Sequence, residues 1–300
     1  MKAVVLRQFD DELALEDAPE PDGDTLALRA AGINFLDVLI RRGRYPQLPE
    51  LPYVPGVEVA GELDGRRVLA LTRHQGGGYA ERVGVDPRWT FPLPERASFE
   101  EGASFLMTFL TAYVPLVRQA RVGPGTTVLV HAAAGGVGSA AVQLAAHLGA
   151  RVVATAGSEV KRDLARELGA AETWAYDEFA GRVRADVVVD PVGGAVFGDT
   201  LRVLEPLGTL IAVGYAGGLW EDLSPALLVG RNVAVQGFYL GRLMQLRPEL
   251  VRECAEELLA LWERGAIRPL VGATYPLAEA ARAHELIESR QSVGKVVLVP

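Results

Sequence analysis

The sequence predicts an α/β protein in which a doubly wound, six-stranded parallel sheet is inserted into a β-rich domain. Continuous apolar strands alternate with helical segments between residues 126 and 238. This alternation is typical of a parallel sheet that helices cover on both faces. Before residue 90, short apolar runs alternate with turns rich in proline and glycine, and such runs indicate β-strands. The same β character returns after residue 270.

The two β-rich ends of the chain are expected to form one domain. We expect the C-terminal tail to fold back onto the N-terminal part, so that this domain comprises residues 1–115 and 265–300. Its expected strands are 3–6, 25–33, 57–63, 67–71, 271–275 and the final G-K-V-V-L-V-P, and its expected helices are 35–43, which Gly43 ends, and 278–287.

The inserted domain is expected to span residues 116–264. Six apolar runs are interpreted as its parallel strands, and helical segments follow them in the order of a doubly wound sheet. The expected strands are 126–130, 151–155, 172–176, 185–190, 208–214 and 232–238; the expected helices are 137–148, 161–169, 194–204 and a long amphipathic helix at 247–264.

Composition excludes several classes of protein. The net charge of −8 argues against a nucleic-acid partner, because such proteins usually carry a basic face. The single cysteine, Cys254, excludes an intramolecular disulfide and a multi-thiolate zinc site. We find neither an apolar run long enough to cross a membrane nor a signal-peptide core, so we expect a cytoplasmic protein without a membrane partner. Lysine is rare and occurs only at Lys2, Lys161 and Lys295.

The stretch H-A-A-A-G-G-V-G (131–138) follows the first expected strand of the inserted domain. At such a strand-to-helix turn, small residues let the backbone approach a pyrophosphate, which the helix N-terminus attracts. A tight turn without a ligand is the alternative, but the six-strand context favours cofactor binding. The three key positions are Ala133, Gly135 and Gly138, and Gly136 and Val137 lie between them.

The end of the second expected strand indicates which dinucleotide binds. An acidic residue that would hold a ribose hydroxyl is missing there, because Ala156, Gly157 and Ser158 occupy the strand end. Lys161 and Arg162 follow within one helical turn. A hydroxyl and a cation suit a 2′-phosphate, so NADPH is the expected cofactor. Glu159 keeps NADH as the alternative, and Ser158 is also expected to cap the next helix.

Six short motifs together resemble the medium-chain dehydrogenase/reductase superfamily, and in particular its zinc-free NADPH:quinone oxidoreductase (zeta-crystallin-like) branch. They are G-I-N-F-L-D-V-L-I-R-R-G-R-Y-P (32–46), P-G-V-E-V-A-G (55–61), G-G-Y-A-E (77–81), L-T-A-Y (110–113), the glycine turn, and G-K-V-V-L (294–298). The resemblance implies a GroES-like β domain around an inserted Rossmann domain, and a homodimer. The apolar 232–238 strand is the candidate sheet edge for pairing across a two-fold axis.

Metal binding is not expected. Where zinc-dependent relatives of the resembling family carry their ligands, this chain has Asn34, Val57 and, approximately, Met107. None of these three side chains is a good Zn²⁺ ligand.

The resemblance places the reacting groups in the segment that lines the cleft in that family. Asn34 is expected to donate from its amide, and Tyr45 from its hydroxyl or by stacking on a flat acceptor. Asp37, one helical turn after Asn34, is expected to orient it. In the alternative interpretation Asn34 is a turn amide, Tyr45 a half-buried aromatic and Asp37 an ordinary first-turn acid.

The resemblance also implies further cofactor contacts. Thr111 matches a position near the nicotinamide, although a helix hydroxyl bonded to the preceding turn is the alternative. Lys161, Tyr176 and Arg290 match the family's adenosine-phosphate pocket. The nicotinamide half is expected to contact the loops at 190–194, 213–218 and 237–239, with Val192, Gly214 and Phe238 as the contact residues.

The sequence therefore predicts an enzyme: an NADPH-dependent oxidoreductase that transfers hydride to a quinone or a related activated carbonyl acceptor without a metal. A quinone is already electrophilic, so orientation and hydrogen bonding suffice. Two alternatives stay open. One is an enone or enoyl-thioester C=C reductase, in which Tyr45 donates the proton. The other is an NADPH-binding structural or RNA-associated crystallin-like protein, against which the acidic charge argues.

Overall fold

The protein was analysed as a computed structural model, which describes residues 1–72, 76–220 and 222–300. The chain divides into two compact units, one comprising Met1–Met107 with Pro269–Pro300 and the other Thr108–Arg268. The sequence analysis put these junctions at 115/116 and 264/265. The difference arises mainly at α3 (Leu106–Val114), because Thr108 and the residues after it group with the second unit, ahead of its first strand.

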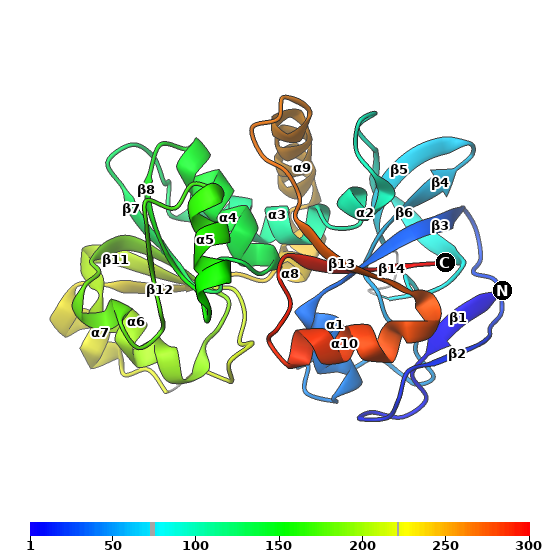
Figure 1. Cartoon of the computed structure of the whole chain (residues 1–300), viewed down its shortest axis with the longest axis horizontal. Helices are drawn as coiled ribbons and strands as arrows, with labels where there is room; N and C mark the ends of the chain where they lie inside the picture. Colours follow the sequence, from blue (N-terminus) through cyan, green and yellow to red (C-terminus); the bar gives the residue numbers. More distant parts are fainter. Residues whose placement is uncertain (73–75, 221) are drawn as a thin grey trace. The chain divides into compact units, whose positions relative to one another are not determined.

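The second unit contains the parallel sheet (Figure 1). Its strands lie in the order β12-β11-β10-β7-β8-β9, and each pair is parallel, which confirms the doubly wound fold class. The strands are β7 (Thr127–Val130), β8 (Arg151–Thr155), β9 (Glu172–Trp174), β10 (Ala185–Asp190), β11 (Leu204–Ala212) and β12 (Ala234–Gly237). The helical segments are η1 (Pro115–Gln119), α4 (Gly136–His147), α5 (Glu159–Glu167), η2 (Phe179–Gly181), η3 (Gly194–Val196), α6 (Phe197–Arg202), α7 (Pro225–Arg231), α8 (Leu240–Leu246) and α9 (Pro248–Glu263).

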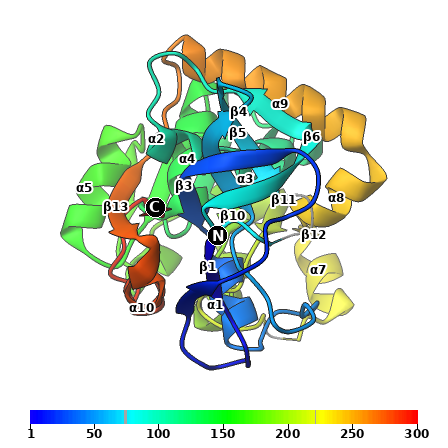
Figure 2. The same ribbon diagram turned by 90° about the vertical axis from the view of Figure 1, so that its right-hand side faces the viewer.

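The first unit is a mixed sheet built from both ends of the chain (Figures 1 and 2). The sheet order is β13-β14-β3-β4-β5-β6, and a second pairing between β3 and β6 closes it on itself. Its strands are β3 (Thr25–Ile33), β4 (Glu58–Leu63), β5 (Arg66–Thr72), β6 (Arg82–Pro92), β13 (Val271–Pro276) and β14 (Lys295–Val299). The ribbon β1 (Lys2–Val5) and β2 (Ala14–Asp17), the helices α1 (Phe35–Arg41), α2 (Phe99–Gly102) and α10 (Ala280–Glu288), and η4 (Leu277–Glu279) complete the unit.

Each unit has its own buried core. The core of the first unit contains Leu26, Val59, Tyr79 and Val296, so residues from both chain ends share it. The core of the second unit includes Leu129, Val188 and Leu210, which come from three neighbouring strands of the parallel sheet. Both units therefore have apolar centres of the kind expected for separate domains.

Some elements differ from the sequence analysis. The helix expected at 194–204 is a short 3₁₀ turn followed by α6, and Leu204 already belongs to β11. The strand β6 was not expected, because Pro87 and two charged neighbours interrupt its alternation. The elements β2, α2, α3, α7 and α8 were also missed. Among the described residues, we find no helix with the length and apolarity needed to cross a membrane.

Candidate functional site

A buried polar cluster lies at the end of β3 in the first unit. Asn34 follows this strand and directly precedes α1. Its side-chain Oδ1 accepts a hydrogen bond from Lys295 Nζ at 2.8 Å, although the two residues are 261 positions apart in sequence. The Asn34 amide nitrogen lies 3.4 Å from both the Gly32 carbonyl and Glu58 Oε2. Asn34 is therefore held by partners from three strands of one sheet.

Lys295 and Glu58 form an ion pair at 3.1 Å with side chains that are 5% and 0% exposed. Glu58 Oε1 also accepts the backbone N–H of Met107 at 2.9 Å. Burial raises the pKa of the Glu58 carboxyl, and Lys295 opposes that rise. The sequence analysis did not assign a role to either residue. Two features of the sequence could have identified them. Lys295 is one of few lysines and begins the apolar run G-K-V-V-L-V, and Glu58 is an acid between apolar residues in P-G-V-E-V-A-G.

Asp37 is fully buried beside Asn34 and fixes the backbone around it. Its Oδ2 accepts the Asn34 backbone N–H at 2.8 Å, and its Oδ1 accepts the Gly56 N–H at 3.1 Å. Gly56 has φ +92°, and a Cβ there would lie 2.4 Å from the Tyr79 ring, so this turn requires glycine. Burial raises the pKa of Asp37 to about 6. The structure therefore brings Asp37 into contact with Asn34, and its carboxylate binds the backbone N–H of Asn34.

Tyr45 lies half-buried in the loop after α1, in the same unit as Asn34 and Asp37. Burial raises the pKa of Tyr53, and the nearby Asp37 carboxylate adds to that rise, so Asp37 and Tyr53 share one region. The expected contact of Tyr45 with an acceptor stays a prediction.

The glycine turn joins β7 to α4 in the second unit. Ala132 has φ +50°, and its N–H donates to the Tyr176 hydroxyl at 3.0 Å, which holds this strained residue in place. A Cβ on Gly138 would lie 2.1 Å from the Ala132 carbonyl oxygen. Gly135 is the N-cap residue of α4, and no side chain caps this helix N-terminus. The turn therefore brings Ala133, Gly136 and Val137 to an N-terminus suited to an anion.

His131, at the start of the same stretch, is a structural residue. Its Nδ1 is 2.7 Å from Thr155 Oγ1 and its Nε2 is 2.8 Å from Thr200 Oγ1. Thr200 donates its own proton to the Val196 carbonyl, so it accepts from His131 Nε2–H, and Thr155 donates to Nδ1. Burial lowers the pKa of His131 to about 3, which keeps the ring neutral. The histidine thus ties the ends of β7 and β8 to α6.

The other expected cofactor residues follow the carboxyl ends of neighbouring strands. Because all pairs in this sheet are parallel, these ends lie along one edge. They are Gly157 and Ser158 after β8, Tyr176 after β9, Val192 after β10, Gly214 after β11 and Phe238 after β12. Thr111 lies in α3 of the same unit, whereas Arg290 follows α10 in the first unit. Their roles in binding stay predictions.

Unpartnered polar atoms accompany this edge. Asp190 ends β10, and its Oδ1 accepts the N–H groups of Val192 and Gly193 at 2.8 and 2.9 Å. In the described part of the chain, Asp190 Oδ2, Tyr215 Oη and Trp220 Nε1 are buried and have no hydrogen-bond partner. Such atoms are rare in native proteins unless water or a ligand meets them. The edge therefore fits a polar cofactor.

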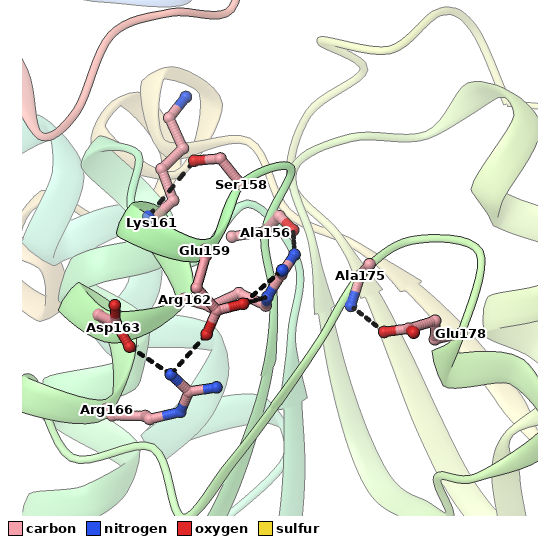
Figure 3. A network of polar contacts seen from close by, with 9 residues as sticks. All are labelled: Ala156, Ser158, Glu159, Lys161, Arg162, Asp163, Arg166, Ala175 and Glu178. Atoms are coloured by element: carbon pink, nitrogen blue, oxygen red, sulfur yellow. Dashed lines mark hydrogen bonds and ion pairs between the residues drawn. The ribbon is translucent and has the colours of Figure 1, made fainter.

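Figure 3 shows how the charged residues after β8 are arranged. The Ser158 hydroxyl caps α5 by accepting the Lys161 N–H at 3.4 Å, as expected. Glu159 is bound by Arg162 and Arg166, and Arg162 also donates to the Ala156 carbonyl at 3.3 Å. The carboxylate that kept NADH as an alternative is thus engaged by two cations on its own helix, which weakens that alternative.

The three positions compared with zinc ligands carry side chains that are poor ligands for Zn²⁺. Asn34 is bound to Lys295, Val57 is a buried aliphatic residue, and the third position is Met107. Outside the short gaps at 73–75 and 221, we find no group of three or more His, Cys, Asp or Glu side chains that could hold a metal ion.

Comparison with known proteins identifies the family. Residues 168–298 match a family described as zinc-binding dehydrogenase. The chain is 33% identical over 303 residues to the quinone oxidoreductase of Rattus norvegicus, covering 94% of this chain and 90% of the relative. It is 35% identical over 318 residues to the human synaptic vesicle membrane protein VAT-1 homolog, covering 94% and 80%.

A solved structure agrees with these relatives. The quinone oxidoreductase from Thermus thermophilus, whose structures include a complex with NADPH, aligns over 100% of both chains with 40% identity and a TM-score of 0.93. The chain belongs to the quinone oxidoreductase branch of the medium-chain dehydrogenase/reductase superfamily. It shares that branch's two-domain fold, so the family expected from the short motifs is confirmed.

We expect the stability of this superfamily member to depend on the protonation of Asp37. Burial raises its pKa from the ordinary value of 3.8, which we take for the unfolded chain, to about 6 in the folded protein. A raised acid pKa means that ionisation destabilises the fold, so the contribution of Asp37 falls as pH rises from about 4 to 6 and is then constant. The loss amounts to about 3 kcal/mol across this window.

Urea unfolding of the wild type and Asp37→Asn at pH 4.5 and pH 7 measures this effect. The difference in unfolding free energy between the two proteins should move in favour of the variant as pH rises. A constant offset would report only the lost acceptor oxygen, and would show that Asp37 does not titrate in this range.

Proposed function

We propose that the protein is an NADPH-dependent oxidoreductase that reduces a quinone, with Asn34 and Tyr45 binding the acceptor. The observation that carries the proposal is the carboxyl edge of the parallel sheet, where a small-residue turn, an uncapped helix N-terminus and unpartnered polar atoms coincide. The Thermus thermophilus relative, whose solved structures include an NADPH complex, supports both cofactor and acceptor.

The residues along this edge are suited to a phosphorylated dinucleotide. Gly135 to Gly138 would hold the pyrophosphate, and Ser158 with Lys161 would hold the 2′-phosphate. Asp190 and Tyr215 would meet the nicotinamide half with their unpartnered atoms. When bound, NADPH supplies a hydride, which carries two electrons and one proton.

Reduction of a quinone to a hydroquinone needs that hydride and one further proton. Negative charge develops on a quinone oxygen during the reaction, and a fixed N–H or O–H donor stabilises it. Asn34 would donate from its amide and Tyr45 from its hydroxyl. In this assignment solvent supplies the second proton, because an aromatic hydroquinone forms without protonation of a carbon atom.

Initial rates with NADPH or NADH, each with a simple quinone or a small enone, test the proposal. We expect fast NADPH oxidation with the quinone. Tyr45→Phe should retain quinone reduction within roughly 10-fold, whereas a loss of over about 100-fold in kcat would show that Tyr45 is an obligatory proton donor. Turnover of the enone alone would make the protein a C=C reductase, and NADPH binding without turnover would favour a structural role.

Lys161 is expected to determine the preference for NADPH. Replacing it with methionine should weaken NADPH binding by roughly 10-fold and change NADH binding little, because only NADPH carries the 2′-phosphate. Nicotinamide fluorescence measures both dissociation constants. The matched control is Arg151→Met, since Arg151 begins β8 at the opposite end of the strand and pairs there with Glu172. Equal losses for both cofactors would exclude this role.

We also propose that the protein is a homodimer that pairs through β12, which lies at an edge of the parallel sheet. Large apolar side chains are exposed on the segments that flank this strand, and such patches mark interfaces. They are Leu219, Leu227, Val229, Tyr239 and Leu246, with exposures of 74%, 43%, 77%, 43% and 58%. Pairing across a two-fold axis would cover this edge.

Val229→Glu should convert the dimer to a monomer in sedimentation velocity without lowering the melting temperature, because Val229 is already 77% exposed within the chain. Val160→Glu is the control, as this residue is 72% exposed on α5 and should leave the dimer intact. A wild-type monomer, or a dimer that survives Val229→Glu, would contradict this interface. The cytoplasmic location stays a prediction from the sequence.

A further inference from the structure

The Lys295 ammonium group has an acceptor for each of its three hydrogens. These acceptors are the Ile33 carbonyl at 2.8 Å, Asn34 Oδ1 at 2.8 Å and Glu58 Oε2 at 3.1 Å. A lysine ammonium has three donors and no acceptor, so these contacts use all of its hydrogens. Lys295 is also only 5% exposed. It therefore acts on a bound molecule only through the groups that it holds.

The contact with Lys295 fixes which end of the Asn34 amide is available. Because an ammonium group only donates, the atom that faces it must be the amide oxygen. The alternative flip would place the amide NH2 against the ammonium, donor against donor. The orientation of Asn34 thus follows from hydrogen-bond chemistry. Lys295 binds the oxygen of the Asn34 amide, so the NH2 group is its other polar end.

The NH2 group of Asn34 is weakly engaged. Its two acceptors, the Gly32 carbonyl and Glu58 Oε2, both lie at 3.4 Å, beyond the usual range for a good hydrogen bond. Asn34 itself is partly exposed. The amide therefore has a firmly bound oxygen and an NH2 group that can exchange a long contact for a shorter one with a ligand oxygen.

We infer that Lys295, with Glu58 as its counter-ion, is a positioning residue that orients the Asn34 amide so that its NH2 group donates to a carbonyl oxygen of the acceptor. The inference rests on the proposed function, and it assigns to the Lys295–Glu58 ion pair the role of orienting the donor that this function needs. A charged donor on the amide oxygen also polarises the amide, which strengthens the N–H as a donor.

Glu58 makes a buried cation tolerable at this place. An unpaired charge in a buried site is strongly destabilising, whereas attraction and hydrogen bonds within a pair offset much of the desolvation penalty. Glu58 meets Lys295 with Oε2 and is itself held by the Met107 N–H at Oε1. Removing one partner alone would leave an unpaired charge, so a test must remove both.

A double-mutant cycle tests the inference. The first change is Glu58→Gln with Lys295→Met, which removes both charges together, and the second is Asn34→Ala. If Lys295 acts through Asn34, the pair variant lowers kcat for quinone reduction by roughly 10- to 100-fold in the wild type. In the Asn34→Ala background it changes kcat by less than about 3-fold. The dissociation constant of NADPH should stay the same in all four proteins.

Two further variants separate positioning from loosening of the fold. Arg41→Met with Glu288→Gln removes another largely buried ion pair of the same unit, while Arg42, which also binds Glu288, keeps its ion pair with Asp10. This control should leave kcat unchanged. Asn34→Asp keeps an acceptor for Lys295 but has no N–H donor, so its kcat should fall as far as that of Asn34→Ala. This variant retains Lys295 and Glu58, and therefore tests the donor even if the pair variant does not fold.

The outcomes distinguish the two proposals. A wild type that reduces no quinone or enone removes the proposed function and this inference together. Normal turnover with additive effects in the cycle, or full activity of Asn34→Asp, overturns the inference alone. Turnover of an enone only leaves the inference intact, because an enone also presents a carbonyl oxygen to the Asn34 amide.

Discussion

The antiparallel pairing of β14 with β3 is the constraint on which the buried polar cluster around Asn34 depends. Val296, Val297 and Leu298 pair with Ile33, Gly32 and Ala31, so the residue before this register, Lys295, falls beside the end of β3. A slip of one residue would turn its side chain to the other face of the sheet. Gly32 allows β3 to approach its neighbours, because a Cβ there would lie 1.8 Å from the Ala103 carbonyl oxygen. Strand β3 and the last strand of the chain, β14, thus build this polar cluster together.

The inserted unit depends on a comparable constraint, the parallel register of its strands. Because every pair runs in the same direction, residues that are far apart in sequence reach one edge at their carboxyl ends. The hydrogen bonds of His131 with Thr155 and Thr200 hold that edge in place, and the Tyr176 hydroxyl holds Ala132. These contacts lie entirely within the protein, so the interactions that shape the glycine turn do not involve a cofactor. Preorganisation of this kind lowers the cost of ordering a binding site.

The sequence predicted the parts of this protein that depend on local pattern and could not predict those that depend on pairing. The parallel strands were found because continuous apolar runs between helices are typical of strands that are buried on both faces of a parallel sheet. Strand β10, for example, has the bounds that the pattern indicated. Asn34 and Asp37 were found in one motif. Glu58 and Lys295 were missed because each looks like an isolated charge in an apolar strand, and only the fold places them 3.1 Å apart. The role of His131 was missed for the same reason.

The chemical nature of Lys295 explains why a charge is retained in a nearly dry position. A buried ion pair contributes little to stability, since well-packed apolar residues of the same volume often serve equally well. Stability alone therefore does not account for the Lys295–Glu58 pair. A neutral polar residue beside Asn34, such as glutamine or serine, both donates and accepts, so it would satisfy the amide in either flip. A group that only donates selects the oxygen of an amide, just as the Gly32 carbonyl and Glu58, which only accept, face its NH2 group. An ammonium group is such a donor, and Glu58 is the counter-charge that lets it occupy this place.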